Sequence, residues 1–172
     1  LIVMGSRGHS SHDGIFTGSN TEKVVRYSNT PVLVVKSKPE SVNFDHIVLA
    51  TDFSLDSVDA VNKALDLLPQ LGKKITLLHI NLPNLNFLST DETDEKISKF
   101  LNKAGLKEKD LNIARISDHN VEDGVLSYAH RHKVTAVSMI TQGRTGLSHF
   151  FGGSISEDVV NHTTLPVITF KL

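Results

Sequence analysis

The two ends of this chain are similar to each other, and this repeat restricts the fold more than any other sequence feature. Residues 1–37 align without a gap with residues 136–172, at an offset of 135 positions. Eleven aligned positions are identical: Met4/Met139, Gly8/Gly143, Phe16/Phe151, Gly18/Gly153, Ser19/Ser154, Glu22/Glu157, Val24/Val159, Val25/Val160, Pro31/Pro166, Val32/Val167 and Lys36/Lys171. Because several of these pairs are Gly or Pro, a duplicated unit explains them better than two segments that became similar independently.

The repeat predicts one incomplete and one complete copy of a domain. We interpret residues 1–37 as the C-terminal part of a first domain and residues 44–172 as a complete second domain. Residues 38–43 are polar and include Pro39, which is typical of a short linker. The chain opens on the apolar run Leu1–Met4, which is typical of a buried strand, so we expect it to be part of a longer protein.

Hydrophobic periodicity in the complete copy predicts strands that alternate with helices. Short apolar runs typical of buried strands occur at His46–Ala50, Ile75–Ile80, Asn112–Ile116, Ala136–Ile140 and Pro166–Phe170. Between them, apolar residues at three- and four-residue spacing predict helices that begin near Ser54, Asp91, Asn120 and Ser154. Gly72 and Gly105 are expected to end the first two helices in a left-handed conformation.

This alternation predicts an α/β fold with a parallel sheet and helices on both faces. In such sheets, ligands bind beyond the carboxyl ends of the strands, at the point where the strand order reverses. For five strands this point falls between the first and the fourth. We therefore expect binding residues directly after Ala50 and after Met139.

Glycines follow the first apolar run, and taken alone they fit ordinary turn residues better than a phosphate-binding loop. Gly5 and Gly8 come directly after Leu1–Met4, and Gly18-Ser19 opens a predicted helix. Glycine lets the backbone approach a phosphate closely, and the N–H groups at a helix N-terminus hold it. The spacing matches neither the dinucleotide fingerprint nor the P-loop.

These residues resemble the universal stress protein family. The resemblance lies in Leu1–Gly8, Gly18-Ser19 and Pro31–Val35, in Gly143–Ser148, Gly153-Ser154 and Pro166–Ile168, and in Ile47–Ser54. It implies a Rossmann-like, five-stranded parallel sheet of order 3-2-1-4-5 with helices on both faces, here with a βαβ remnant of a preceding copy. Family members commonly pair through the fifth strand, so we expect Val32–Val35 to lie antiparallel to Val167–Phe170, with self-association through these strands.

The resemblance also implies a site for ATP or a related adenine nucleotide, with no metal beyond the Mg²⁺ that accompanies it. ATP-binding members carry the pattern G-x2-G-x9-G-[ST]. The implied binding residues are Gly5, Gly8, Gly18 and Ser19 in the first copy, and Thr51, Asp52, Ile80, Met139, Gly143, Gly153 and Ser154 in the second. Asp52 matches the residue that meets the nucleoside, where a carboxylate accepts hydrogen bonds from ribose hydroxyls. Taken alone, Asp52 is equally consistent with a turn or a helix cap.

The two copies depart from the family pattern in different ways. In the second copy Ile140 replaces the first glycine, and a β-branched side chain resists positive φ and fills space near a nucleotide. The first copy has all the glycines but lacks its own first strand and Asp. Nucleotide binding by the second domain and its absence therefore both stay open.

Composition excludes several classes of function. The chain has no Cys and a net charge of −1, which excludes thiol chemistry and argues against a nucleic-acid partner. No apolar run is long enough to cross a membrane, and we expect a cytoplasmic protein. No pattern supplies a general base, a metal site or an activated nucleophile, so an enzymatic role is not favoured. We predict a stress-response regulatory module; the alternatives are a slow adenine-nucleotide hydrolase and a nucleotide-free dimerisation scaffold.

Overall fold

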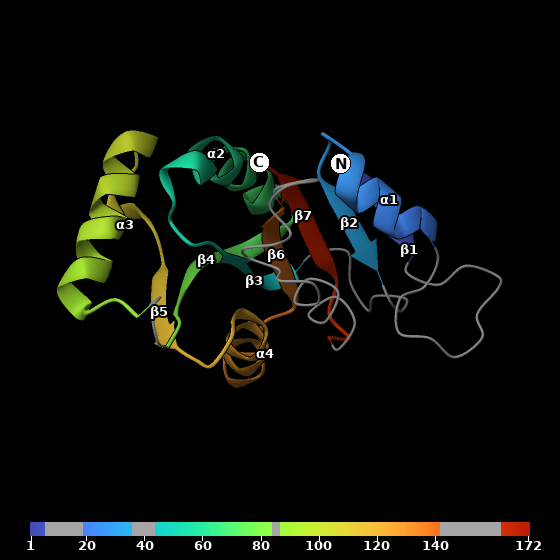
Figure 1. The fold of residues 1–172 in the computed structure, drawn as a ribbon. Coiled ribbons are helices and arrows are strands. Elements are labelled where there is room, and N and C mark those ends of the chain that lie inside the picture. The colour runs from blue at the N-terminus through green and yellow to red at the C-terminus, as the bar shows by residue number, and fades with distance from the viewer. Residues whose placement is uncertain (6–18, 36–43, 84–86, 142–162) are drawn as a thin grey trace.

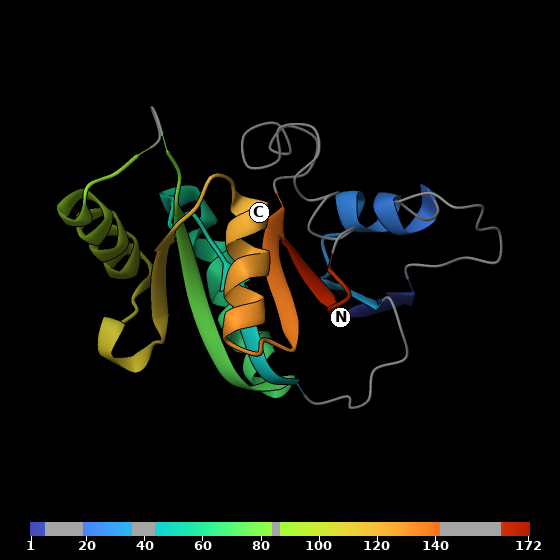
Figure 2. The same ribbon diagram turned by 90° about the horizontal axis from the view of Figure 1, so that it is seen from below.

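A computed structural model describes residues 1–5, 19–35, 44–83, 87–141 and 163–172. These residues form one sheet with helices packed against it (Figures 1 and 2). The strands are β1 (Ile2–Gly5), β2 (Val32–Val35), β3 (Phe44–Ala50), β4 (Gly72–Asn81), β5 (Ile113–Ser117), β6 (Ala136–Thr141) and β7 (Val167–Lys171). The helices are α1 (Ser19–Tyr27), α2 (Val58–Leu67), α3 (Thr90–Ala104) and α4 (Val121–Arg131), with single 3₁₀ turns at Leu55–Ser57, Leu68–Gln70 and Glu108–Asp110.

The sheet has seven strands, in the order β1-β2-β7-β6-β3-β4-β5. The last five strands of this series pair in parallel and reproduce the predicted order 3-2-1-4-5, so the predicted fold class is confirmed. The sheet has two strands more than the five predicted for the complete copy, because β1 and β2 continue it beyond β7. Without β2, strand β7 would expose an edge of unpaired backbone groups.

The two ends of the chain pair in the same register. Four parallel pairs join β1 to β2, from Ile2↔Val32 to Gly5↔Val35. The pairs that join β6 to β7 from Val137↔Val167 to Ile140↔Phe170 are the same four at an offset of 135 positions. The sequence repeat is therefore also a repeat of strand pairing.

Strand β2 joins the two parts of the sheet by antiparallel pairing with β7. The pairs are Val32↔Thr169, Leu33↔Ile168 and Val34↔Val167. The predicted antiparallel contact between Val32–Val35 and Val167–Phe170 thus occurs within one chain. Because β2 and β7 each have a strand on both sides, their backbone edges are already paired. Association between two chains remains a prediction.

Apolar side chains fill both faces of the sheet. Helices α2 and α3 cover one face, over a cluster that includes Leu49, Phe53 and Phe100 (Figure 1). Helix α4 covers the other face, over a cluster that includes Val125 and Met139. Strands buried on both faces consist of almost continuous apolar residues, which is why β3 and β6 were recognisable in the sequence.

Helix ends follow the predicted signals in part. Ser89 and Glu92 form a capping box at the start of α3, Gly105 ends α3 with φ +72°, and the Asn120 side chain accepts from the Asp123 N–H at the start of α4. Two expectations were wrong. Ser54 precedes the 3₁₀ turn Leu55–Ser57 instead of α2, and its side chain makes no capping hydrogen bond. Gly72 opens β4 instead of ending a helix.

Gly72 lies where β4 packs closely against β3. A Cβ atom at Gly72 would lie 2.7 Å from Ile47 Cδ1. Its role is therefore to let β4 approach β3 and not to adopt a left-handed conformation.

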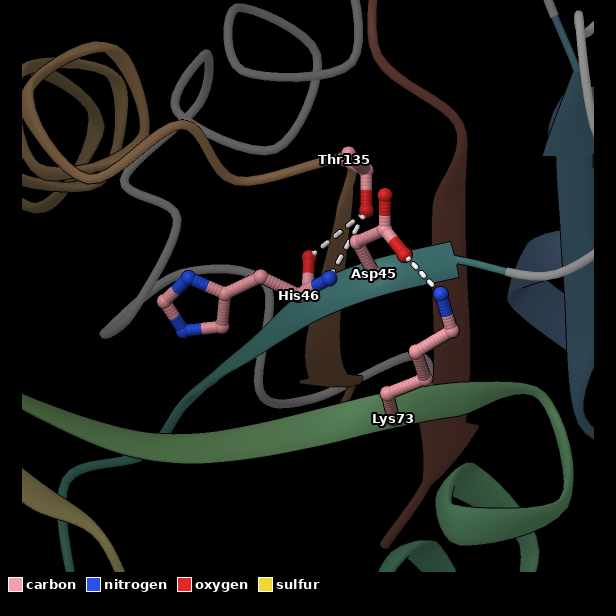
Figure 3. Close-up of polar contacts among 4 residues, drawn as sticks. All are labelled: Asp45, His46, Lys73 and Thr135. Atoms are coloured by element: carbon pink, nitrogen blue, oxygen red, sulfur yellow. Dashed lines mark hydrogen bonds and ion pairs between the residues drawn. The ribbon is translucent and has the colours of Figure 1, made fainter.

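Polar contacts fix the amino-terminal end of β3 (Figure 3). The Thr135 hydroxyl accepts from the His46 N–H and donates to the His46 carbonyl, at 3.0 Å each. Nε2 of His46 lies 2.9 Å from Thr76 Oγ1 on β4, and the exposed Lys73–Asp45 ion pair (2.6 Å) lies beside it. These contacts join β3 to β4 and β6 at the end of the sheet opposite to the predicted site.

Candidate functional site

The register of the sheet brings four predicted site residues to the carboxyl ends of three central strands, β3, β4 and β6. Ala50, the last residue of β3, is paired with Leu78 of β4 and with Met139 of β6. The Thr51 N–H continues this pairing by donating to the Leu78 carbonyl at 3.1 Å. Thr51 and Asp52 therefore follow β3 beside the ends of β4 and β6, where Ile80 and Met139 lie. The strand order reverses between β3 and β6, which is where ligands bind in open α/β sheets.

The other predicted residues lie elsewhere or outside the described residues. Gly5 is the last residue of β1, and Ser19 is the first residue of α1. Three strands separate β1 from β3, so this pair is not adjacent to Asp52. The remaining predicted residues, Gly8, Gly18, Gly143, Gly153 and Ser154, are outside the described residues.

Asp52 belongs to a tight turn at the end of β3. Its Oδ1 accepts from the Ser54 N–H at 3.0 Å, and Thr51 Oγ1 accepts from the Phe53 N–H at 3.2 Å. This Asx-type turn shows that Asp52 has the structural role that the sequence left open. Asp52 is partly exposed, and among the described residues no hydrogen bond or ion pair to Oδ2 occurs.

Phe53 holds this turn against the core. It has a φ of +53°, a left-handed conformation that is rare for a bulky residue, and it is 1% exposed. Its ring packs edge-on against Phe100 of α3, with centroids 5.2 Å apart, and tilted against His79 of β4 at 6.0 Å. The turn that contains Asp52 and Ser54 is therefore anchored in the core by the side chain of Phe53.

His79 is a buried histidine beside this turn. It is 4% exposed, and its Nδ1 has no hydrogen-bond partner in the described part of the chain. Burial lowers the pKa of His79 to about 4; the positive charges of Lys96 and Arg115 act in the same direction, and Asp52 acts against them. The imidazole is therefore uncharged at neutral pH.

Sequence reasoning missed both Phe53 and His79 as neighbours of Asp52. A histidine inside the apolar run Ile75–Ile80 was a signal that could have been used. No local pattern indicates the positive φ of Phe53.

Ile140 occupies the position where the family pattern has glycine. It lies inside β6, paired with Phe170, and packs partly buried against the cluster on the α2 and α3 face. The extended conformation of a strand needs no positive φ, so this part of the expected obstacle is absent.

The side chains of Met139 and Ile80 pack into the other face of the sheet. Met139 is 2% exposed, and Ile80 packs so closely against α4 that a Cβ at Gly124 would lie 2.9 Å from Ile80 Cδ1. The side chains of both residues therefore belong to the core on the α4 face.

Neither a metal-binding cluster nor a membrane-spanning helix occurs in the described part of the chain. The described residues contain no group of three or more His, Asp or Glu side chains placed to hold a metal ion. Among the helices that the structure describes, none is both long and apolar enough to cross a bilayer.

The strand order and the helices on both faces define an open α/β domain. The chain belongs to the universal stress protein family: the family model matches residues 1–36 and 43–171. It is 24% identical over 188 residues to universal stress protein Rv1996 of Mycobacterium tuberculosis. The alignment covers 100% of this chain and 59% of that relative. The chain thus spans about three fifths of the length of this curated relative.

Solved structures of the family have the same fold. A universal stress protein from Archaeoglobus fulgidus matches with a TM-score of 0.68 and 25% identity, over 99% of this chain and 60% of that one. A universal stress protein in complex with cAMP matches with a TM-score of 0.50 and 16% identity, over 74% of this chain and 97% of that one. The second likeness shows the fold alone.

Proposed function

We propose that this chain is a cytoplasmic stress-response regulatory module that binds ATP or a related adenine nucleotide at the carboxyl ends of β3, β4 and β6. The observation that carries the proposal is the placement of Asp52. Its carboxylate is partly exposed at the reversal of strand order, and Oδ1 alone is engaged by a described residue. Oδ2 is left to accept hydrogen bonds from the ribose hydroxyls of a nucleotide.

The chemistry around Asp52 supports a nucleoside more than a free anion. A carboxylate repels phosphate, so the phosphates of a bound nucleotide lie away from Asp52 and carry their Mg²⁺ with them. The family member solved with cAMP binds an adenine nucleotide, which favours the same ligand class here.

We propose further that residues 1–37 are the end of a first universal stress protein domain, residues 38–43 a linker, and residues 44–172 a second domain. The identical register of the β1–β2 and β6–β7 pairs supports this division. The antiparallel β2–β7 pairing then joins two copies through their fifth strands.

The first experiment asks whether nucleotide is bound. The purified protein is denatured, and released small molecules are identified by mass spectrometry; calorimetric titration with Mg·ATP follows. We expect an adenine nucleotide in the released fraction or saturable ATP binding. If no nucleotide is released and no ATP binding is detected, the alternative of a nucleotide-free scaffold is supported. Steady ADP production over time would support the alternative of a slow hydrolase.

A matched pair of variants locates the site. Asp52→Asn keeps an oxygen acceptor for the Ser54 N–H but removes the charge that strengthens a hydrogen bond to ribose. We expect ATP affinity to fall about tenfold, since hydrogen bonds to charged groups contribute about 1.5–3 kcal/mol. Asp45→Asn is the control, because Asp45 is exposed at the opposite end of β3. Equal ATP affinities in the two variants would contradict the assigned site.

A further inference from the structure

The turn after β3 holds a conformation that its own residues do not favour. A left-handed φ at a residue other than glycine costs about 1–3 kcal/mol and persists only where the surroundings enforce it. At Phe53 the backbone bond from its N–H to Thr51 Oγ1 is local. A second local bond, from the Ser54 N–H to Asp52 Oδ1, spans Phe53. The restraint from distant segments comes from the buried ring of Phe53, which packs against the rings of Phe100 and His79.

The direction of the Asp52 carboxylate depends on this conformation. The bond between Asp52 Oδ1 and the Ser54 N–H spans Phe53, so its geometry depends on the backbone conformation of Phe53. If the Phe53 ring left its position, the turn would relax to a more common backbone conformation. The Asp52 carboxylate would then lose its present orientation relative to the end of β3.

His79 is difficult to explain as a core residue alone. A buried polar atom without a partner lowers stability, and native proteins seldom keep one without a reason. Leu77 occupies the same face of β4 two residues earlier, is 1% exposed, and shows that an apolar side chain suits this face. What distinguishes position 79 is that its ring lies against Phe53.

We propose that His79 is a positioning residue for Asp52: its ring holds Phe53 in the left-handed conformation and thereby orients the carboxylate at the edge of β3, β4 and β6. The proposal rests on the proposed function for its ligand, but the orientation of Asp52 is a property of the free protein and is measurable without nucleotide. His79 itself touches no ligand in this scheme.

The test compares three variants in the complete chain. His79→Val removes the ring and keeps a residue that suits a strand. His79→Phe restores a ring without the nitrogen atoms. Leu77→Val is the control, because it truncates a buried side chain on the same face of the same strand, further from the turn. If His79→Val does not fold, His79→Leu takes its place, since leucine keeps the volume but not the ring.

The first measurement is amide hydrogen exchange at Ser54, whose N–H reports directly on the bond to Asp52. We expect exchange at least tenfold faster than wild type in His79→Val, and within twofold of wild type in His79→Phe and Leu77→Val. Equal rates in His79→Val and Leu77→Val would overturn the proposal, because the effect would then be general loosening of the core. Failure of His79→Phe to restore protection would overturn it as well.

The second measurement is Mg·ATP affinity by calorimetry. We expect about tenfold weaker binding in His79→Val and near wild-type binding in His79→Phe and Leu77→Val. If the wild type binds no ATP while Ser54 exchange follows the expected pattern, the proposed function fails and the positioning role stands. If ATP binds but Ser54 exchange is unchanged in His79→Val, the positioning role fails and the proposed function stands.

Discussion

The Thr135 hydroxyl is the most informative single group for the stability of this fold. It bonds to both backbone groups of His46, which lies at the start of β3 (Figure 3). Thr135→Val keeps the shape and removes both bonds. The His46 carbonyl still accepts from the Thr135 N–H at 2.8 Å, but the His46 N–H is left without its acceptor. An unsatisfied group of this kind costs about 1–3 kcal/mol, so we expect about 2 kcal/mol of lost stability.

Urea denaturation followed by circular dichroism measures this loss. With a slope of about 2 kcal/mol per molar urea, the midpoint should fall by about 1 M, with an unchanged slope. Thr30→Val is the control, because Thr30 is exposed and bonds to Ser28 through its backbone groups. A midpoint within about 0.3 M of the wild type in Thr135→Val would refute the reasoning, since this corresponds to less than about 1 kcal/mol.

Three further predictions concern single positions. Burial lowers the pKa of His79 from 6.5 to about 4, so the unfolded chain binds a proton that the folded chain does not; stability is full above pH 6.5 and falls as the pH drops towards 4. In His79→Phe, the loss of unfolding free energy between pH 7 and pH 4.5 should be smaller than in the wild type by up to about 3 kcal/mol. Urea midpoints of both proteins at the two pH values measure this difference. Gly105→Ala should cost about 1 kcal/mol in thermal unfolding, because its φ is +72° while the space around it is open; an equal loss in Gly105→Asn would argue against backbone strain as the cause. Gly124→Ala should cost about 1–3 kcal/mol, because the new Cβ would lie 2.9 Å from Ile80 Cδ1; Ile80→Val in the same background should recover part of it, and no recovery would disprove the contact as the cause.

Local signals in the sequence were sufficient for most of the second copy. Apolar runs and their spacing predicted β3 to β7, and Gly105 and Asn120 marked helix ends where the structure has them. The order of these strands in the sheet was implied by the family resemblance and is confirmed. Local signals failed where packing decides the outcome. Gly72 was expected to end a helix, but its lack of a side chain serves the contact with Ile47, a residue that is distant in sequence.

By itself, the sequence determined that residues 1–37 and 136–172 are similar and where the apolar runs lie, because periodicity and an offset of 135 positions are properties of residue order alone. Only the tertiary structure decided that Asp52 stands between the ends of β4 and β6 and that Phe53 turns against its preferred conformation. The physical reason is that both depend on contacts between distant segments: the strand register places Ala50 beside Leu78 and Met139, and the rings of Phe100 and His79 hold Phe53. No local pattern encodes such contacts, because they exist only once the strands and helices have packed together.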